Sequence, residues 1–135
     1  MNARQAPIVG IAFLAAACAG CTDAKTSWLR DQTKSFNDMA DAMATISDVP
    51  SYEAAKPKLK RLIDADGERR KKFLARLSAE ERKTWREDLK ASPEIGKYDE
   101  ALKRYLKERD HLADIPDVRK RLADELKMLS PAPDG

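Results

Sequence analysis

The chain has 135 residues, of which 26 are lysine or arginine and 23 are aspartate or glutamate, so its formal net charge is only +3. Aromatic residues make up 6% of the chain, and there are five glycines and one histidine. A composition dominated by charged residues, alanine and leucine is typical of long helices. A single histidine and two cysteines also leave little material for nucleophilic catalysis or a metal site.

The first twenty residues have the three parts of a bacterial export signal. Arg4 supplies a positive charge, residues 8–17 form an uncharged apolar stretch, and small residues occupy positions 15–20. A stable membrane-spanning helix needs about 20 apolar residues, so this stretch is too short for a permanent anchor. We therefore expect a signal at 1–20, an exported domain at 21–130 and a disordered tail at 131–135.

The only two cysteines, Cys18 and Cys21, lie at the end of this signal. Residues 18–21 (Cys-Ala-Gly-Cys) resemble the lipobox of bacterial lipoproteins, in which small residues precede the cysteine that is acylated. The resemblance implies that Cys21 carries fatty acyl chains such as palmitate and becomes the first residue of the mature protein. Residues 15–18 (Ala-Ala-Ala-Cys) also resemble the box, which leaves Cys18 as the alternative.

These features predict a lipoprotein that its N-terminal lipid holds to a membrane of the cell envelope, facing the periplasm or the exterior. Diacylglyceryl and amide-linked chains bury enough methylene groups for stable attachment. A soluble secreted protein is the alternative. Because no cysteine follows Cys21, the exported domain must be held together by its packed core without disulfides.

The clearest helix runs from about residue 23 to Ser47. One apolar seam with a single polar member follows steps of three and four residues through Leu29, Gln32, Phe36, Met39, Met43 and Ile46. Residues 48–51 (Asp-Val-Pro-Ser) predict a turn, because a residue before proline is disfavoured in the α region.

Three or four further helices follow. Ser51 is expected to cap a second helix that runs to Leu77, with Pro57 near its start and Gly67 weakening its middle. Ser78 and Glu81 form the pattern of a capping box that starts a third helix, which ends near Lys90. The fourth is expected to begin at residues 92–94 (Ser-Pro-Glu), with Ser92 at the cap, and a last one to follow Pro116.

No alternating strand pattern is present, so the sequence predicts an all-α fold of four to five helices. A tight turn joins the first two helices, which should form an antiparallel hairpin that the others complete to a small bundle. Residues 21–55 carry 3 basic and 6 acidic groups, whereas residues 56–78 carry 9 basic and 3 acidic groups. We therefore expect opposite charges to flank the seam of this hairpin.

The basic segment includes a run of four cations, Arg69, Arg70, Lys71 and Lys72. Such a run suits an anionic lipid surface. The exported location argues against nucleic acid as the partner. The alternative is that these residues form the solvated face of an amphipathic helix.

His111 lies three residues from both Glu108 and Asp114, but one histidine with two carboxylates is a poor zinc site. Met39 or Met43 together with His111 would imitate the Met/His ligation of haem, although methionine in an apolar seam usually fills a core. We therefore expect neither a metal nor a cofactor.

Residues 64–68 (Asp-Ala-Asp-Gly-Glu) do not match a calcium loop, because the glycine is fourth rather than sixth. The prominent serines, Ser51, Ser78 and Ser92, all stand at expected helix starts. Without a nucleophile beside a base, the sequence predicts that the protein is not an enzyme.

Residues 77–82 (Leu-Ser-Ala-Glu-Glu-Arg) resemble the Leu-Thr-x-x-Gln element of the Spy/CpxP-type periplasmic chaperones and stress sensors, with Ser78 for threonine and Glu81 for glutamine. Trp85 and the preceding basic segment are similar to that family as well, which shows the element twice, whereas this chain has it once. The resemblance implies a cradle that holds client proteins.

The chain as a whole resembles the short helical lipoproteins of bacteria. We therefore expect a non-enzymatic, lipid-anchored helical protein that acts through other envelope proteins, through coiled-coil self-association, or through the envelope itself. A client-binding chaperone or stress sensor of the Spy/CpxP type is the alternative.

Overall fold

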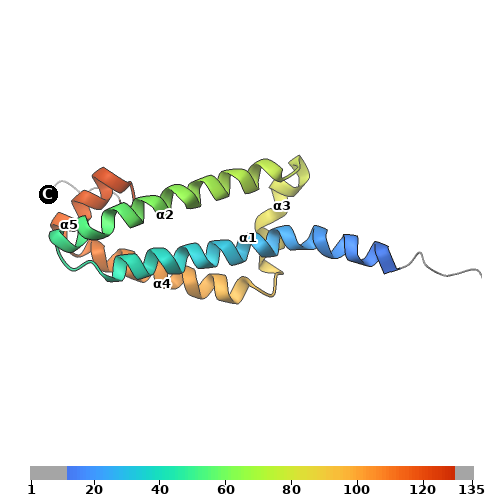
Figure 1. Cartoon of the computed structure of the whole chain (residues 1–135), viewed down its shortest axis with the longest axis horizontal. Helices are drawn as coiled ribbons and strands as arrows, with labels where there is room; N and C mark the ends of the chain where they lie inside the picture. The colour runs from blue at the N-terminus through green and yellow to red at the C-terminus, as the bar shows by residue number, and fades with distance from the viewer. Residues whose placement is uncertain (1–11, 130–135) are drawn as a thin grey trace, which may run out of the picture.

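The computed structural model describes the backbone of residues 12–129 and the side chains of residues 24–129 (Figure 1). This part of the chain forms α1 (Ala12–Ala44), α2 (Val49–Arg76), α3 (Ala79–Lys90), α4 (Ile95–Ala113), α5 (Pro116–Arg121) and a π-helical turn, η1 (Leu122–Leu126), without any strand. The predicted all-α fold class is confirmed. The first half of the predicted signal and the predicted tail at 131–135 lie outside the described residues.

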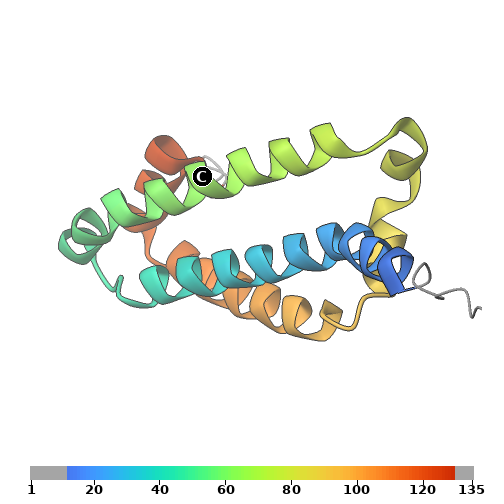
Figure 2. The same cartoon turned by 45° about the vertical axis from the view of Figure 1, so that its right-hand side comes forward.

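The helices α1 and α2 run antiparallel, as the hairpin prediction requires (Figures 1 and 2). The short helix α3 turns the chain at the far end of α2, and α4 then lies along the other side of α1. Of its neighbours, α1 packs most closely against α4 and less closely against α2 and α3. The helix α1 is therefore the central element of the bundle.

The apolar seam of α1 is fully used inside the bundle. All six members of the predicted seam are buried, five on α1 and Ile46 in the turn that follows, since α1 ends at Ala44 rather than near Ser47. Five of them contribute to the three apolar clusters, and Gln32 is hydrogen-bonded to Asp66. One cluster joins Met43 and Ile46 to Tyr52 and to the C-terminal helices, and the next joins Phe36 and Met39 to Ala101. The predicted seam is confirmed, and this face of α1 is covered by the chain itself.

The start of α2 differs from the prediction. The helix begins at Val49, and Asp48 rather than Ser51 is its N-cap. The Ser51 N–H donates to Asp48 Oδ1 at 2.9 Å, and the Asp48 N–H donates to Ser51 Oγ at 3.1 Å. Pro50 is tolerated because the first amides of a helix have no intrahelical acceptor, so the missing N–H is not needed there.

The start of α3 agrees with its prediction, whereas that of α4 does not. The Glu81 N–H donates to Ser78 Oγ at 3.1 Å, and the Ser78 N–H donates to Glu81 Oε2 at 2.7 Å, which completes the expected capping box. The helix α4 begins at Ile95, and Ser92 does not cap it. The Ser92 N–H is still bonded to the Leu89 carbonyl of α3, so residues 92–94 form a turn.

The opposite charges expected along the α1–α2 hairpin form no ion pair between these two helices among the described side chains. Among the described side chains, the ion pairs that leave α1 reach α3, α4 or the turn between them. They are Lys25–Asp88 at 2.8 Å, Arg30–Glu94 at 3.2 Å and Asp41–Arg104. The ion pairs of α1 are thus directed toward the α3–α4 side of the bundle, and many cations of α2 have no ion-pair partner among the described side chains.

Candidate functional site

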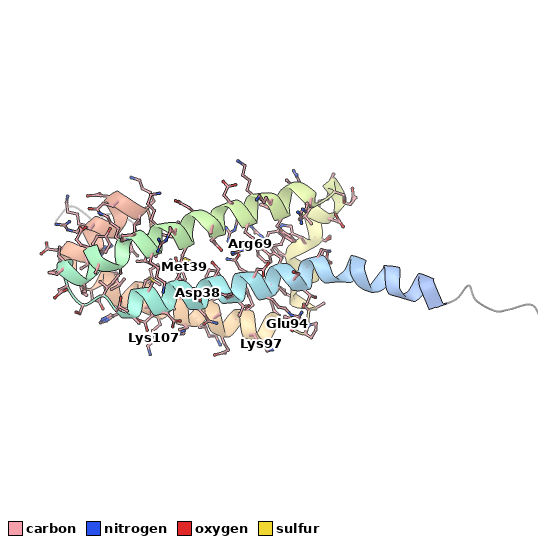
Figure 3. All side chains as sticks on the ribbon, in the orientation of Figure 1. Asp38, Met39, Arg69, Glu94, Lys97 and Lys107 are labelled. Atoms are coloured by element: carbon pink, nitrogen blue, oxygen red, sulfur yellow. The ribbon has the colours of Figure 1, made fainter. Side chains whose placement is uncertain are left out.

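A small polar layer joins α1 to α2 near the middle of the hairpin. Asp66 Oδ1 accepts hydrogen bonds from Gln32 Nε2 at 2.7 Å and Ser35 Oγ at 3.0 Å, and Arg69 Nη1 lies 3.6 Å from the same oxygen. Gln32 and Ser35 are both buried. The polar member of the seam thus has its partner on α2, and Arg69 is drawn toward α1 from the basic helix (Figure 3).

Next to this layer, toward the α3 end, lies an aromatic cluster. The ring of Trp28 stacks on Phe73 with their centroids 4.7 Å apart, and Trp85 meets both rings edge-on at 5.7 Å. Tyr98 lies 6.4 Å from Trp28. Stacked and edge-to-face rings add to the stability that burial provides, so this end of the bundle has a rigid aromatic centre contributed by four helices.

On one side of the aromatic cluster is an open groove of about 310 Å³, here called the Trp28 groove. Trp28 forms part of it and is only 5% exposed, and its indole N–H is buried without a hydrogen-bond partner. The groove is lined by Ala24, Lys25, Ser27, Trp28, Asp31, Arg69, Lys72, Phe73, Arg76, Leu77 and Glu81.

Four cations and two carboxylates face the Trp28 groove. Lys25 is paired with Asp88, and the Glu81 carboxylate accepts the Ser78 N–H. Lys72 and Arg76 are exposed and have no ion-pair partner among the described side chains. Asp31 and Glu81 also lack an ion-pair partner there, but the whole lining has a net charge of +2. The groove therefore combines a buried aromatic wall with an excess of cations, which suits an anionic group attached to an apolar body.

A second groove of about 350 Å³, the Trp85 groove, lies on the other side of the aromatic cluster. Arg86 lies over the Trp85 ring, 5.4 Å from its centroid. The lining is more apolar than that of the Trp28 groove and consists of Leu29, Arg70, Leu74, Trp85, Arg86, Leu89, Lys90, Ile95, Tyr98 and Asp99.

The structure divides the predicted patch of Arg69, Arg70, Lys71 and Lys72. Arg69 and Lys72, three residues apart, line the Trp28 groove, whereas Arg70 lines the Trp85 groove and Lys71 lines neither. Successive residues of a helix point about 100° apart, so four in a row cannot share one face. Arg69 and Lys72 share the Trp28 groove with Arg76, which belongs to the predicted basic segment 56–78 but not to its run of four cations.

The remaining candidates form no site. His111 is exposed near the end of α4, on the surface of the molecule, whereas Met39 and Met43 are buried in the core. No group of three or more histidine, cysteine, aspartate or glutamate side chains suited to a metal ion occurs in the described part of the chain. Within residues 64–68, which do not match a calcium loop, Asp66 accepts hydrogen bonds in the polar layer and Asp64 forms an ion pair with Lys60.

Cys18 and Cys21 fall in the first turns of α1, where only the backbone is described, so the predicted lipidation lies outside the described side chains. The first part of α1 extends beyond the bundle at the end where α2 meets α3 (Figure 1). None of the helices in the described part of the chain has the length and apolar character that crossing a bilayer requires.

No protein-family model, curated protein or solved structure matches the chain. The segment that resembles the Spy/CpxP-type element, residues 77–82, comprises the link between α2 and α3 and the first turn of α3. Its Ser78 and Glu81 serve the capping box, and Leu77 lines the Trp28 groove.

Proposed function

We propose that the protein is an exported lipoprotein without enzymatic activity, which works through contacts made close to the membrane that holds it. The observation that carries this proposal is the continuity of α1. The helix that contains Cys21 runs without interruption to Ala44, so the position expected to carry the lipid passes directly into the central helix of the bundle. An anchor at Cys21 would hold the packed domain next to the bilayer, with no intervening linker.

The roles of the serines support a non-enzymatic function. Ser51 and Ser78 have their hydroxyl groups engaged in the capping boxes of α2 and α3, and Ser92 Oγ accepts the Glu94 N–H at 3.3 Å. A serine nucleophile needs a base within hydrogen-bond reach and an orienting group behind it. Among the described residues, none of the hydrogen bonds of these three serines involves His111, which lies in the last turn of α4.

Mass spectrometry of the N-terminal peptide of the protein isolated from its native membranes tests the anchor. We expect the mature chain to begin at Cys21 and to carry a diacylglyceryl group together with an amide-linked acyl chain. Cys21→Ser should leave the unprocessed precursor, and Cys18→Ser is the matched control that should be processed normally. An unmodified N-terminus after residue 18 would instead identify a soluble secreted protein.

A second candidate, a chaperone that holds client proteins, is favoured by the apolar Trp85 groove. We expect the mature protein to suppress the aggregation of an unfolded test protein at several-fold molar excess. Ile95→Lys, which places a charge in the groove, should weaken this suppression. Leu106→Lys changes a similarly half-buried position of α4 outside the groove and serves as the control. Absence of suppression by the unaltered protein would contradict the chaperone proposal.

A further inference from the structure

The Trp28 groove lies directly beside the expected anchor. Ala24 and Lys25 line it, and they are three and four residues after Cys21 on the same continuous helix. A helix rises about 1.5 Å per residue, so Cys21 and Ala24 are separated by only about 5 Å along the axis. With the acyl chains of Cys21 in the bilayer, the groove lies at the depth of the lipid headgroups.

The groove is lined by four cations and by the two carboxylates of Asp31 and Glu81, so its lining has a net charge of +2, which is the sign that this position favours. Lys72 and Arg76 stand one helical turn apart on α2, are exposed, and have no acidic partner among the described side chains. Anionic leaflets attract nearby cations over a Debye length of about 8–10 Å. Because residues four apart are neighbours on one face of a helix, the two side chains can interact with the same phosphate group.

The wall of the groove also suits a lipid. Trp28 is contributed by α1 seven residues after Cys21, and tryptophan favours the boundary between headgroups and acyl chains. Its buried indole N–H has no acceptor within the described side chains and backbone. Trp28 and Phe73 line the groove together with these cations, so that apolar rings and positive charges occur in one groove, as an amphiphile with a negative head requires.

From this arrangement we propose that the Trp28 groove binds the headgroup of an anionic phospholipid of the leaflet that holds the anchor, an inference that rests on the proposed lipidation of Cys21. Lys72 and Arg76 hold the phosphate, and Trp28 lies against the glycerol and the first methylene groups. The lipid thereby fixes the orientation of the whole bundle on the membrane, with the α3 end toward the bilayer and the α5 end away from it.

Lysine acetylation measured residue by residue tests this orientation on the mature, membrane-purified protein reconstituted into vesicles. We expect Lys72 to react several-fold more slowly in vesicles that contain phosphatidylglycerol than in vesicles of phosphatidylcholine alone. Lys58 is the internal control, because it is exposed on the same helix, also lacks an ion-pair partner and lies outside the groove. Its rate should be the same in both vesicles.

Two variants sharpen the test. Arg76→Gln should remove most of the protection of Lys72, whereas Arg61→Gln, an exposed change elsewhere on α2, should leave it intact. Equal rates for Lys72 in the two vesicles, or equal protection of Lys58, would overturn the inference. Protection of Lys72 by inorganic phosphate in phosphatidylcholine vesicles would also overturn it, in favour of a free anion.

The N-terminal peptide recovered from the same samples separates the two proposals. An acylated protein without selective protection of Lys72 retains the proposed function and loses the groove inference. A protein without acyl chains loses both, since the groove is then no longer held at the headgroups.

Discussion

Asp66 of α2 is hydrogen-bonded to two buried side chains of α1. One of its oxygens accepts from both Gln32 and Ser35, and its side chain is only 18% exposed. Gln32 could be identified from the sequence as the polar member of an apolar seam. Asp66 could not be identified as its partner, because this pairing depends on how two helices more than thirty residues apart align in space.

Removing Asp66 should therefore destabilise the protein. Asp66→Ala leaves the buried Gln32 amide and Ser35 hydroxyl without their acceptor, and an unsatisfied buried polar group costs about 1–3 kcal/mol. Urea unfolding followed by circular dichroism measures the change. Asp64→Ala is the matched control, because Asp64 is exposed and pairs only with Lys60, one turn away. It should change the stability by less than about 0.5 kcal/mol, and equal losses for the two variants would show that the polar layer contributes little.

Trp28 shows what the seam alone did not predict. The three- and four-residue spacing identified Leu29 as the first apolar member of the seam, and Leu29 is indeed fully buried. Trp28 lies one position earlier, beside that seam, and is buried only because α2 and α3 bring Phe73 and Trp85 against it. The available signal for this cluster was a tryptophan next to the seam, four residues before Gln32. Its partners Phe73 and Trp85 could not be predicted, because tertiary packing brings them to it.

Helix boundaries were predicted correctly where hydrogen bonds within the first turn determine them. They were missed where a hydrogen bond to the preceding helix shifts the start of the next one. The Ser78–Glu81 capping box needs no distant partner and was predicted correctly. Ser92 has the same local appearance, but its N–H is bonded to Leu89 of α3, which delays the start of α4 to Ile95. Turns between consecutive helices thus carry the largest errors of the sequence-based prediction.

Gly67, in the middle of α2, offers a gain in stability. The glycine is exposed, and a Cβ built on it meets nothing within 4 Å. Gly67→Ala should therefore stabilise the protein by about 0.5–1 kcal/mol, because alanine loses less backbone entropy in a helix interior. Gly96→Ala is the control. It has equally open surroundings in the first turn of α4 and should gain less, since helix ends are less constrained. Thermal unfolding distinguishes the two, and an unchanged or lower Tm for Gly67→Ala contradicts the expectation.

Glu125 of the short C-terminal element η1 forms hydrogen bonds with two side chains of α2. Its Oε2 accepts from Tyr52 Oη and from Lys56 Nζ, both at 2.8 Å, and Arg121 lies nearby. The hydrogen bond from Lys56, followed by that from Tyr52, lowers the pKa of Glu125 below its ordinary value of 4.5. Desolvation and the hydrogen bond to Glu125 raise the pKa of Tyr52.

This arrangement predicts a pH-dependent contribution to stability. Because the pKa of Glu125 is lowered on folding, its carboxylate stabilises the folded protein at pH values above 4.5, and this contribution disappears as the pH falls through the lowered value. We expect Glu125→Gln to lower Tm at pH 7 and to have little effect near pH 3. Glu100→Gln, which alters an exposed carboxylate paired with Lys103, should change Tm little at pH 7. A constant difference between Glu125→Gln and the unaltered protein across this range would contradict the assignment.

At the scale of the whole molecule, the burial of the α1 seam bears on self-association. The three- and four-residue spacing is typical of a helix that pairs with another chain, but in this fold the seam is covered by α2, α3 and α4. We therefore expect the purified protein, in a density-matched mild detergent, to sediment with a mass that does not depend on concentration. A mass that rises toward that of a dimer would show that another face mediates association.

The all-α class and the α1–α2 hairpin followed from periodicity and a short turn, since both are local properties. The larger interface of α1, which it forms with α4, could not be predicted from local properties. The helix α4 reaches α1 only after the chain has crossed the end of the bundle through α3 (Figure 2). The charge excess of the α2 segment suggested pairing with the acidic α1, whereas the folded protein joins Asp41 to Arg104 of α4. Lys72 and Arg76 of the Trp28 groove are among the α2 cations that have no ion-pair partner in the described part of the chain.

Under the proposed lipid anchor, the unbroken course of α1 would determine the angle between the domain and the membrane. A flexible tether lets a domain rotate freely, but a continuous helix sets the rotational phase between its first residue and everything packed on it. One residue inserted between Cys21 and Ala24 turns the bundle by about 100° about the helix axis and carries Lys72 and Arg76 to another azimuth. Seven inserted residues restore the phase to within about 20° while raising the bundle by about 10 Å. If Cys21 carries the lipid, the length of the short stretch before Ala24 therefore determines both the rotation of the bundle about the α1 axis and its height above the membrane.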